Sequence, residues 1–468
     1  LCPCFTIFIC GENVRQAGAF AVILSPNQNR ETRAEREGRK RSFRPGTLAK
    51  PRRVLSKKSQ VNQNDRYLIG GIPAETLAER YGTPVYVYDC AQIEQQYARL
   101  DGVFRPVADH RIHFAMKSLS NINILRVIRG LGAGVDTVSV NEIRLALLAG
   151  FAPKDIIYTP NGVPMQEIDQ AVELGVHIHI DSVETLQVFA LTHPGVPVGI
   201  RITPEIFAGG HAKISVGGRE SKFGIPLERM DEVEELAKRE GLPIVGVHLH
   251  TGSDIYDVDV FLEGAERVFS VARRFPVEYI DFGSGFKVPY RPDEHGTDVE
   301  LLGEKLSARF NRFVQQTGRP VRMVVEPGKF LVSRCGTLLV RADWVKHTPA
   351  ADFVQVDSGL CHLIRPMMYD AYHHILNISN PCGAPRQYNV TGFICETDNF
   401  AVHRTLPEVR RGDLLAILNA GAYGYTMASV YNSRFRPPQV LVKDRTDYQI
   451  SRRETLDDLL ALQTDYGF

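Results

Sequence analysis

The sequence lacks the features that would set it apart from ordinary globular proteins. Beyond its first ten residues it has no apolar run approaching the roughly 20 residues that cross a bilayer, so we expect no membrane partner. The formal net charge is only +1, which argues against a nucleic-acid groove as the main function. Eight cysteines among 468 residues have no paired spacing, which argues against a disulfide scaffold. We therefore expect reduced thiols and a cytoplasmic protein.

The charge is distributed unevenly along the chain. Residues 30–58 contain twelve Arg or Lys against three Glu, a net charge of +9, which leaves −8 for the rest of the chain. The apolar run "LCPCFTIFIC" precedes this basic stretch, whereas a secretory signal places its positive charge first. We predict that residues 1–60 form a disordered or non-native extension without a role in the chemistry.

Short β-rich runs alternate with helix-like segments over residues 106–330. Eight such runs occur: "IHFAMK", "GVDTVS", "IIYTP", "HIHID", "VPVGIRI", "IVGVHLH", "VEYIDFG" and "VRMVVEP". The segments between them, such as "NEIRLALLAG", have apolar residues at three- and four-residue spacing. Eight strand–helix repeats predict a closed parallel (β/α)8 barrel, with an open doubly wound sheet as the alternative.

A second domain is predicted over residues 331–468. Its β-type runs, including "GTLLVRADWVK", "DFVQVDSG" and "DLLAILNAG", have no helical segments between them, which favours an antiparallel β domain. The run "TPVYVYD" at residues 83–89, within an N-terminal segment over residues 61–105, could add a strand to this sheet.

Polar and ionisable residues gather where the predicted barrel strands end, which is where such barrels place their chemistry. These strand-end residues are Lys117, Asp136 with Ser139, Asn161, Asp181, Arg201, His248 with His250, Gly283 to Gly285, and Glu326. Their recurrence on successive strands indicates one site rather than isolated surface charges.

Three of these features match what pyridoxal phosphate requires. Lys117 could form a Schiff base with the cofactor aldehyde. The turn Gly283–Ser284–Gly285 and the hydroxyl of Ser253 could hold its phosphate. Glu326 could keep the pyridine nitrogen protonated, although a structural salt bridge would also explain that residue.

The two histidines of "HLH" admit two interpretations. His248 and His250 alternate along one strand and therefore face the same side, a spacing that could hold zinc. No further His or Asp set completes a hydrolytic metal site, so we favour stacking of one imidazole on a flat cofactor ring and expect no metal.

Further candidates lie in the downstream domain. A thiol at Cys395 could return a proton to a carbanion, and Glu396 could bind a cationic substrate group. Arg365 and Tyr369 are four residues apart, so on a helical turn both could face one anion. The loop "GAYGYTMASVYNSRFRP" is rich in glycine and tyrosine and could cover a pocket.

Several ordered motifs resemble one enzyme family over residues 66–445. They are "HFAMKS", "GVDTVSVNEI", "HLHTGSD", "DFGSGFKVPY", "EPGKFLV", "IRPMMYDAYH", "CETD" and "GAYGYTMASVYNSRFRP". The chain resembles the fold-type III pyridoxal-phosphate decarboxylases, which include ornithine decarboxylase and, more distantly, alanine racemase. Within them it is most similar to the diaminopimelate decarboxylase family, which converts meso-2,6-diaminopimelate to L-lysine and CO₂.

The resemblance implies specific roles. Lys117 would bind the cofactor covalently, His250 would stack on its ring and Glu326 would pair with its nitrogen, while Cys395 would protonate the substrate carbon. The other implied cofactor contacts are Asp136, Ser253, Gly283, Ser284, Gly285 and Tyr423. The implied substrate contacts are Lys329, Arg365, Tyr369, Glu396 and Tyr423. The resemblance also implies a homodimer whose active sites are shared across the interface.

Two departures from the family pattern bear on these roles. Lys329 stands where the family usually has arginine, which replaces a bidentate grip by a point charge. Ser284 replaces a glycine of the phosphate turn. A decarboxylase for another basic amino acid or for carboxynorspermidine, and a catalytically silent regulatory homologue, are the alternatives.

Overall fold

Eight parallel strands close into a barrel in the computed structural model, which describes residues 66–206 and 221–468. The expected extension over residues 1–60 lies outside the described residues. The ring closes because β12 pairs with β4 and β8 pairs with β10, which confirms the barrel and excludes the open sheet. The barrel strands are β4 (His110–Ala115), β5 (Gly134–Thr137), β6 (Ile156–Tyr158), β7 (His177–Ile180), β8 (Val198–Thr203), β10 (Ile244–Leu249), β11 (Tyr279–Asp281) and β12 (Arg322–Val325). A short strand β9 (Ile225–Pro226) also pairs with β8.

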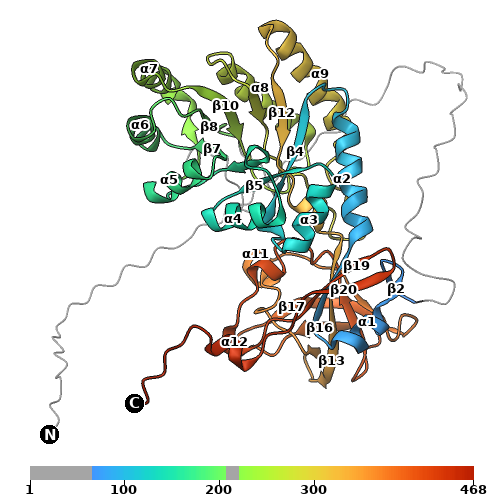
Figure 1. Cartoon of the computed structure of the whole chain (residues 1–468). Helices are drawn as coiled ribbons and strands as arrows, with labels where there is room; N and C mark the ends of the chain where they lie inside the picture. Colours follow the sequence, from blue (N-terminus) through green and yellow to red (C-terminus); the bar gives the residue numbers. More distant parts are fainter. Residues whose placement is uncertain (1–65, 207–220) are drawn as a thin grey trace, which may run out of the picture. The chain divides into compact units, whose positions relative to one another are not determined.

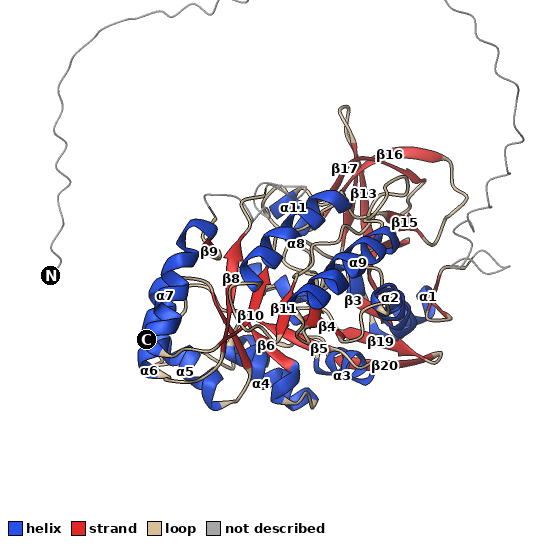
Figure 2. Ribbon diagram, turned by 90° about the horizontal axis from the view of Figure 1, so that it is seen from above, coloured by secondary structure: helices blue, strands red, loops and turns tan. Residues whose placement is uncertain are grey.

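Helices surround the barrel, and Figure 2 shows them as an outer ring around the strands. They are α2 (Cys90–Phe104), α3 (Ile122–Gly130), α4 (Val140–Ala149), α5 (Met165–Glu173), α6 (Val183–Thr192), α7 (Met230–Glu240), α8 (Val258–Ala272) and α9 (Val299–Thr317). Local sequence fixes where several of them begin. Before α4, for example, Ser139 Oγ accepts from the N–H of Glu142 while the Glu142 carboxylate accepts from the N–H of Val138.

The barrel core consists of apolar side chains from both faces of the strands. Strand residues such as Phe114, Val135 and Ile200 are fully buried, and they pack against helix residues such as Ile143 and Leu186. Parallel strands covered on both faces favour this composition, which explains why apolar residues dominate the predicted runs.

The second sheet has the order β17-β16-β14-β13-β3-β19-β20, with β18 pairing both β13 and β15. Its strands are β3 (Val85–Asp89), β13 (Gly336–His347), β14 (Asp352–Val356), β15 (Ile375–Asn377), β16 (Pro385–Thr391), β17 (Asn399–Pro407), β18 (Leu414–Ile417), β19 (Gln439–Lys443) and β20 (Thr446–Ser451). A two-stranded ribbon of β1 (Leu68–Ile69) and β2 (Ile72–Pro73) lies before helix α1 (Ala74–Tyr81). Figure 1 shows β13, β16, β17, β19 and β20 together with α1.

Two expectations for this sheet need correction. The N-terminal strand β3 does join it, but the sheet is mixed rather than antiparallel, because β14 pairs in parallel with β16 and β3 with β19. It is also not free of helices: α11 (Arg365–Tyr369) lies between β14 and β15, while α10 (Lys329–Val332) precedes β13 and α12 (Leu456–Leu460) follows β20. Parallel pairing joins β3 and β19 across most of the chain, a relationship that leaves no local sequence signal.

The barrel and the second sheet meet beside Lys117. The N–H of Tyr423 donates to the carbonyl of Ser118 at 2.8 Å, which fixes the Tyr423 loop against the end of β4. Gly421 permits this approach, because a Cβ at that position would lie 1.8 Å from the carbonyl oxygen of Val332. Tyr423 itself has a φ of 55°, a costly conformation for a non-glycine residue that often marks functional sites.

Among the helices of the described ranges, none is both long enough and apolar enough to cross a bilayer.

Candidate active site

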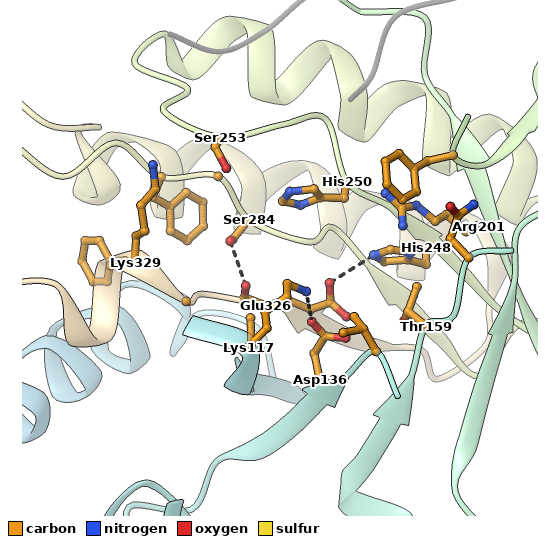
Figure 3. Close-up of a pocket in the computed structure, with 18 of the residues that line it drawn as sticks. Lys117, Asp136, Thr159, Arg201, His248, His250, Ser253, Ser284, Glu326 and Lys329 are labelled. Atoms are coloured by element: carbon orange, nitrogen blue, oxygen red, sulfur yellow. Dashed lines mark hydrogen bonds and ion pairs between the residues drawn. The ribbon is translucent and has the colours of Figure 1, made fainter. Parts of the chain in front are cut away.

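A cavity of about 600 Å³ lies where the barrel strands end (Figure 3). Most strands contribute to it, so the structure brings most of the strand-end residues together, whereas Ser139, Asp181 and Gly283 do not line it. The predicted residues that line it are Lys117, Asp136, Asn161, Arg201, His248, His250, Ser253, Ser284, Gly285, Glu326, Lys329 and Tyr423.

Lys117 lies in the single turn Met116–Ser118 that follows β4. Its Nζ donates to Oδ2 of Asp136, at the end of β5, over 2.7 Å. Asp136 is almost fully buried, whereas 40% of the Lys117 side chain remains exposed to the cavity. Burial opposes the charge on Lys117, but Asp136, Tyr423 and Glu326 outweigh it and raise the pKa of the amine. Burial, together with Glu326, raises the pKa of Asp136 to about 7.

Glu326 ends the eighth barrel strand and is held from two sides. The Nε2–H of His248 donates to its Oε2 at 3.1 Å, and Ser284 Oγ donates to its main-chain carbonyl at 2.8 Å. Burial raises the pKa of Glu326, while Lys117 and other donors and cations oppose that rise. His248, rather than His250, is thus the histidine that contacts this carboxylate.

His250 lies one residue beyond the end of β10 and lines the cavity without contacting Glu326. Burial and the nearby cations Arg201 and Lys117 lower its pKa well below the ordinary value, so the ring is neutral. Among the described residues, no group of three or more potential metal ligands includes His250. The candidate ligand group in the described residues consists of His179, His248, Asp281 and Glu326, so the two histidines of "HLH" do not come together as a ligand pair.

The residues of the glycine turn after β11 differ in what they contact. The N–H of Gly283 donates to Oδ1 of Asp281 at 2.8 Å, and Gly283 does not line the cavity. Ser284 and Gly285 do line it, beside Ser253. Gly285 has a φ of 101°, and a Cβ there would lie 2.1 Å from the carbonyl oxygen of Gly252, so only glycine fits.

A second cavity of about 720 Å³ adjoins the first and shares Lys117, Phe223, Ser253, Lys329 and Tyr423 with it. Arg365 and Tyr369 of α11 both line this second cavity. Arg365 is buried, and its Nη1 contacts the Tyr290 hydroxyl at 3.0 Å and His373 Nε2 at 3.3 Å. These contacts hold a cation in a fixed place at the cavity wall.

Lys329 lies at the junction of the two cavities. Its Nζ is 2.5 Å from Oδ1 of Asp254, and the residue is only 8% exposed. The ion pair fixes the ammonium group between the space beside Lys117 and the space beside Arg365.

Cys395 and Glu396 do not lie with the other candidates in this chain. Both are exposed, and neither lines either cavity. The thiol is within 3.5 Å of the Glu396 carboxylate, Asn432 donates to the sulfur, and Tyr431 donates to Glu396.

The sequence interpretation gave no role to several residues that the structure places at the site. Phe223 and Lys222 line the first cavity from a loop without a motif, whereas Tyr290 lines the second cavity from the end of the motif "DFGSGFKVPY". Asp281 lies behind Glu326 and ends a strand, so the strand-end rule could have found it.

The cavity fits pyridoxal phosphate on observations of the structure itself. Oδ1 of Asp136 and Oε1 of Glu326 are buried acceptors that receive no hydrogen bond from any residue of the described ranges, so a ligand can supply their donors. Ser253, Ser284 and the Gly285 turn offer hydroxyl and main-chain groups to an anion. A lysine amine lies between these two features.

Barrel, second sheet and site together define a pyridoxal-phosphate enzyme of the fold-type III class. The family described as "Pyridoxal-dependent decarboxylase, pyridoxal binding domain" matches residues 90–333. The chain is 38% identical to a diaminopimelate decarboxylase of Methanothermobacter thermautotrophicus, over 86% of this chain and 97% of that protein. The chain belongs to the diaminopimelate decarboxylase family of pyridoxal-dependent decarboxylases.

Solved structures agree with this assignment. A diaminopimelate decarboxylase of Methanocaldococcus jannaschii in complex with L-lysine is 31% identical, with a TM-score of 0.80 over 86% of this chain and 97% of that chain. The Helicobacter pylori enzyme complexed with L-lysine is also 31% identical, with a TM-score of 0.76 over 83% of this chain and 98% of that chain.

Proposed function

We propose that this chain decarboxylates meso-2,6-diaminopimelate to L-lysine and CO₂ with pyridoxal phosphate. The observation that carries the proposal is the pair of adjoining cavities, one around Lys117 and one around Arg365, joined at Lys329. Diaminopimelate has two amino-acid ends, and the two cavities provide for one end each.

Pyridoxal phosphate, when bound, supplies an aldehyde that an amine can hold and a ring that accepts the electron pair left by CO₂. Lys117 is the amine we assign to the aldehyde. Ser253, Ser284, Gly285 and Tyr423 would hold the phosphate side.

Asp136 keeps the Lys117 amine in place through the 2.7 Å hydrogen bond. His250, neutral and at the cavity wall, would stack on the cofactor ring. Glu326 would accept from the pyridine N–H and so hold the proton that makes the ring a strong electron acceptor. Gly283 would act indirectly, because its N–H already donates to Asp281.

The far end of the substrate carries a carboxylate that takes no part in the reaction. Arg365 would bind it as a fixed, buried cation, with Tyr369 on the same helical turn and Lys329 as a second positive charge. Ornithine and arginine have no second carboxylate, so this lining favours diaminopimelate over them.

Cys395 would donate a proton to the substrate carbon that has lost CO₂, and Glu396 would bind the far ammonium group. Neither lines a cavity of its own chain, and both are exposed on the second domain. We infer a homodimer in which these two residues enter the partner's site. In this proposal residues 106–330 form the barrel domain. Residues 331–468, together with the strand from residues 61–105, form the second domain.

We also propose that the protein is cytoplasmic. The cysteines of the described ranges, Cys90, Cys335, Cys361, Cys382 and Cys395, are all free. A reducing compartment keeps the Cys395 thiol available as a proton donor. Loss of activity in reductant-free buffer, restored by a thiol, would agree with it.

The test measures CO₂ release from meso-diaminopimelate, ornithine, arginine and carboxynorspermidine by the enzyme loaded with pyridoxal phosphate. We expect release from the first substrate, and the Lys117→Ala variant serves as the matched inactive control. Release from ornithine, arginine or carboxynorspermidine alone would contradict the substrate assignment. A protein that takes up cofactor and shows its near-violet band without any release would instead be the silent homologue.

A further inference from the structure

Two carboxyl groups lie together at the ends of β11 and β12, Asp281 behind the cavity and Glu326 at its wall. Asp281 is fully buried and Glu326 is 6% exposed. Potential ligand atoms of these two residues, His179 and His248 lie within 4.8 Å of one another. We call Asp281 and Glu326 the carboxyl pair.

The hydrogen bonds around the carboxyl pair leave one oxygen on each side without a donor. Oδ1 of Asp281 accepts from the N–H of Gly283, and Oε2 of Glu326 accepts from His248. Oδ2 of Asp281 and Oε1 of Glu326 have no donor among the residues that the structure describes.

His179 cannot supply the missing donor. One of its ring nitrogens contacts the hydroxyl of Thr159 at 3.0 Å, and the other contacts the hydroxyl of Tyr279 at 2.9 Å. Its ring stacks on that of His248, with the ring centres 4.8 Å apart. His179 therefore supports His248 by packing and leaves the two oxygens of the carboxyl pair without a donor.

The two oxygens without a donor belong to residues whose potential ligand atoms lie within 4.8 Å of one another, and an ionised carboxylate can only accept, so neither group could satisfy the other while both are charged. Two negative charges this close and this buried disfavour each other, which favours a proton on one of the two carboxyl groups. The asymmetry lies in the surroundings: Glu326 receives the hydrogen bond of His248 and faces Lys117 and Arg201, which stabilise its negative charge. Burial and the charge of Glu326 raise the pKa of Asp281 well above its ordinary value.

We propose that Asp281 is a positioning residue that carries a proton and donates it to Glu326. The neutral Asp281 bridges two elements, accepting from Gly283 in the phosphate turn and donating to Glu326 at the end of β12. A carboxylate oxygen accepts two hydrogen bonds, so Glu326 can still accept from a ligand N–H. The inference rests on the proposed function only for the identity of that ligand.

The charged and titratable groups around Asp281 come from every element packed against it. They are Glu326 from β12, His248 from β10, His179 from β7, Arg201 from β8, Asp136 from β5, Tyr279 from β11 itself, and Lys117 from the turn after β4. Both histidines are neutral, because burial lowers the pKa of each well below its ordinary value. Neutral imidazoles leave the negative charge of Glu326 to be stabilised by hydrogen bonds and by Lys117 and Arg201.

The experiment compares Asp281→Asn with Asp281→Ala. An asparagine can accept from Gly283 and donate to Glu326, so it copies the neutral form of Asp281, whereas alanine removes both bonds. Titration of each apoenzyme with pyridoxal phosphate should give a dissociation constant within about threefold of wild type for asparagine. For alanine it should be weaker on the order of tenfold or more, the usual effect of losing a hydrogen bond to a charged group.

The pH dependence separates this role from simple packing. In the wild type, loss of the shared proton at alkaline pH places two charges together and should weaken cofactor binding. Asp281→Asn has no proton to lose there, so its binding should persist to higher pH. Infrared difference spectra of the two apoenzymes should show a protonated carboxyl band that is present in the wild type and missing in Asp281→Asn.

Asp357→Asn is the matched control, since Asp357 also accepts from a main-chain N–H but follows β14, far from the barrel strands β11 and β12 in the chain. It should keep both the infrared band and the weakening of cofactor binding at alkaline pH.

The proposal fails if a folded Asp281→Asn binds the cofactor as weakly as Asp281→Ala, or if the infrared band persists. Should Asp281→Ala not fold, the asparagine variant alone decides. Wild-type protein that takes up no cofactor would overturn the proposed function, while the infrared result on apoenzyme would still judge the shared proton.

Discussion

Nζ of Lys117 donates to Oδ2 of Asp136 over 2.7 Å, between the ends of two neighbouring barrel strands. The ion pair joins the amine assigned to the cofactor to a carboxylate that is 1% exposed. Parallel register places Ala115 beside Asp136, so Lys117, two residues further along, turns back over its neighbour strand.

Asp136→Asn should shift the pH dependence of cofactor uptake to lower pH. An amine attacks an aldehyde in its neutral form, and Asp136 raises the pKa of Lys117, so removing this charge favours the neutral amine. Loss of an opposite charge at this distance shifts a pKa by about 1 to 3 units. Stopped-flow absorbance of apoenzyme mixed with pyridoxal phosphate over a range of pH gives the midpoint. An unchanged midpoint would mean that Asp136 does not control the amine.

Arg365→Gln should raise KM for diaminopimelate by about 10- to 100-fold while kcat changes little. Arg365 is held by Tyr290 and His373 at the wall of the second cavity, away from the bond that breaks. Its hydrogen bonds to the far carboxylate are the same before and during the reaction, which is the signature of uniform binding.

Steady-state rates of CO₂ release measure this split, and Arg341→Gln is the control. Arg341 donates to the carbonyl of Gly412 and lines neither cavity. A fall in kcat with KM unchanged would assign Arg365 to the chemical step instead.

The sequence predicted the barrel part of the site better than the rest for a physical reason. Lys117 and Glu326 end strands, and parallel strands in a barrel bring their ends together whatever the loops do. Phe223 reaches both cavities from a loop whose path depends on packing that no local pattern encodes. The parallel pairing of β3 with β19 was missed because the two strands meet only after the chain between them has folded.

His113→Gln should flatten the acid side of the stability curve. Burial lowers the pKa of His113 to about 3, so between pH 6.5 and about 3 the unfolded chain binds a proton that the folded chain does not. Stability therefore rises with pH across this window and is lost as the pH falls below 6.5. One such proton is worth about 1.4 kcal/mol per pH unit. Urea unfolding of the apoenzyme from pH 4 to 7 measures the slope; an identical slope in the variant would show that His113 already titrates normally in the fold.

Mixing Lys117→Ala with Cys395→Ala should restore activity that neither variant has alone. Cys395 is exposed and lines no cavity of its own chain, whereas Lys117 lies at the centre of one. If Cys395 enters the partner's cavity, a mixed dimer combines both lesions in one site and leaves the other site intact. Random exchange of subunits should then give about one quarter of the wild-type activity, since half of the dimers are mixed and each keeps one site.

Each variant incubated alone under the same exchange conditions is the control. Absence of any recovery, with mixed dimers demonstrated by differential tagging, would place Cys395 and Lys117 in the same subunit's site or remove Cys395 from the reaction. Recovery would also require the wild-type thiol, so a Lys117→Ala partner that additionally carries Cys395→Ala should restore nothing.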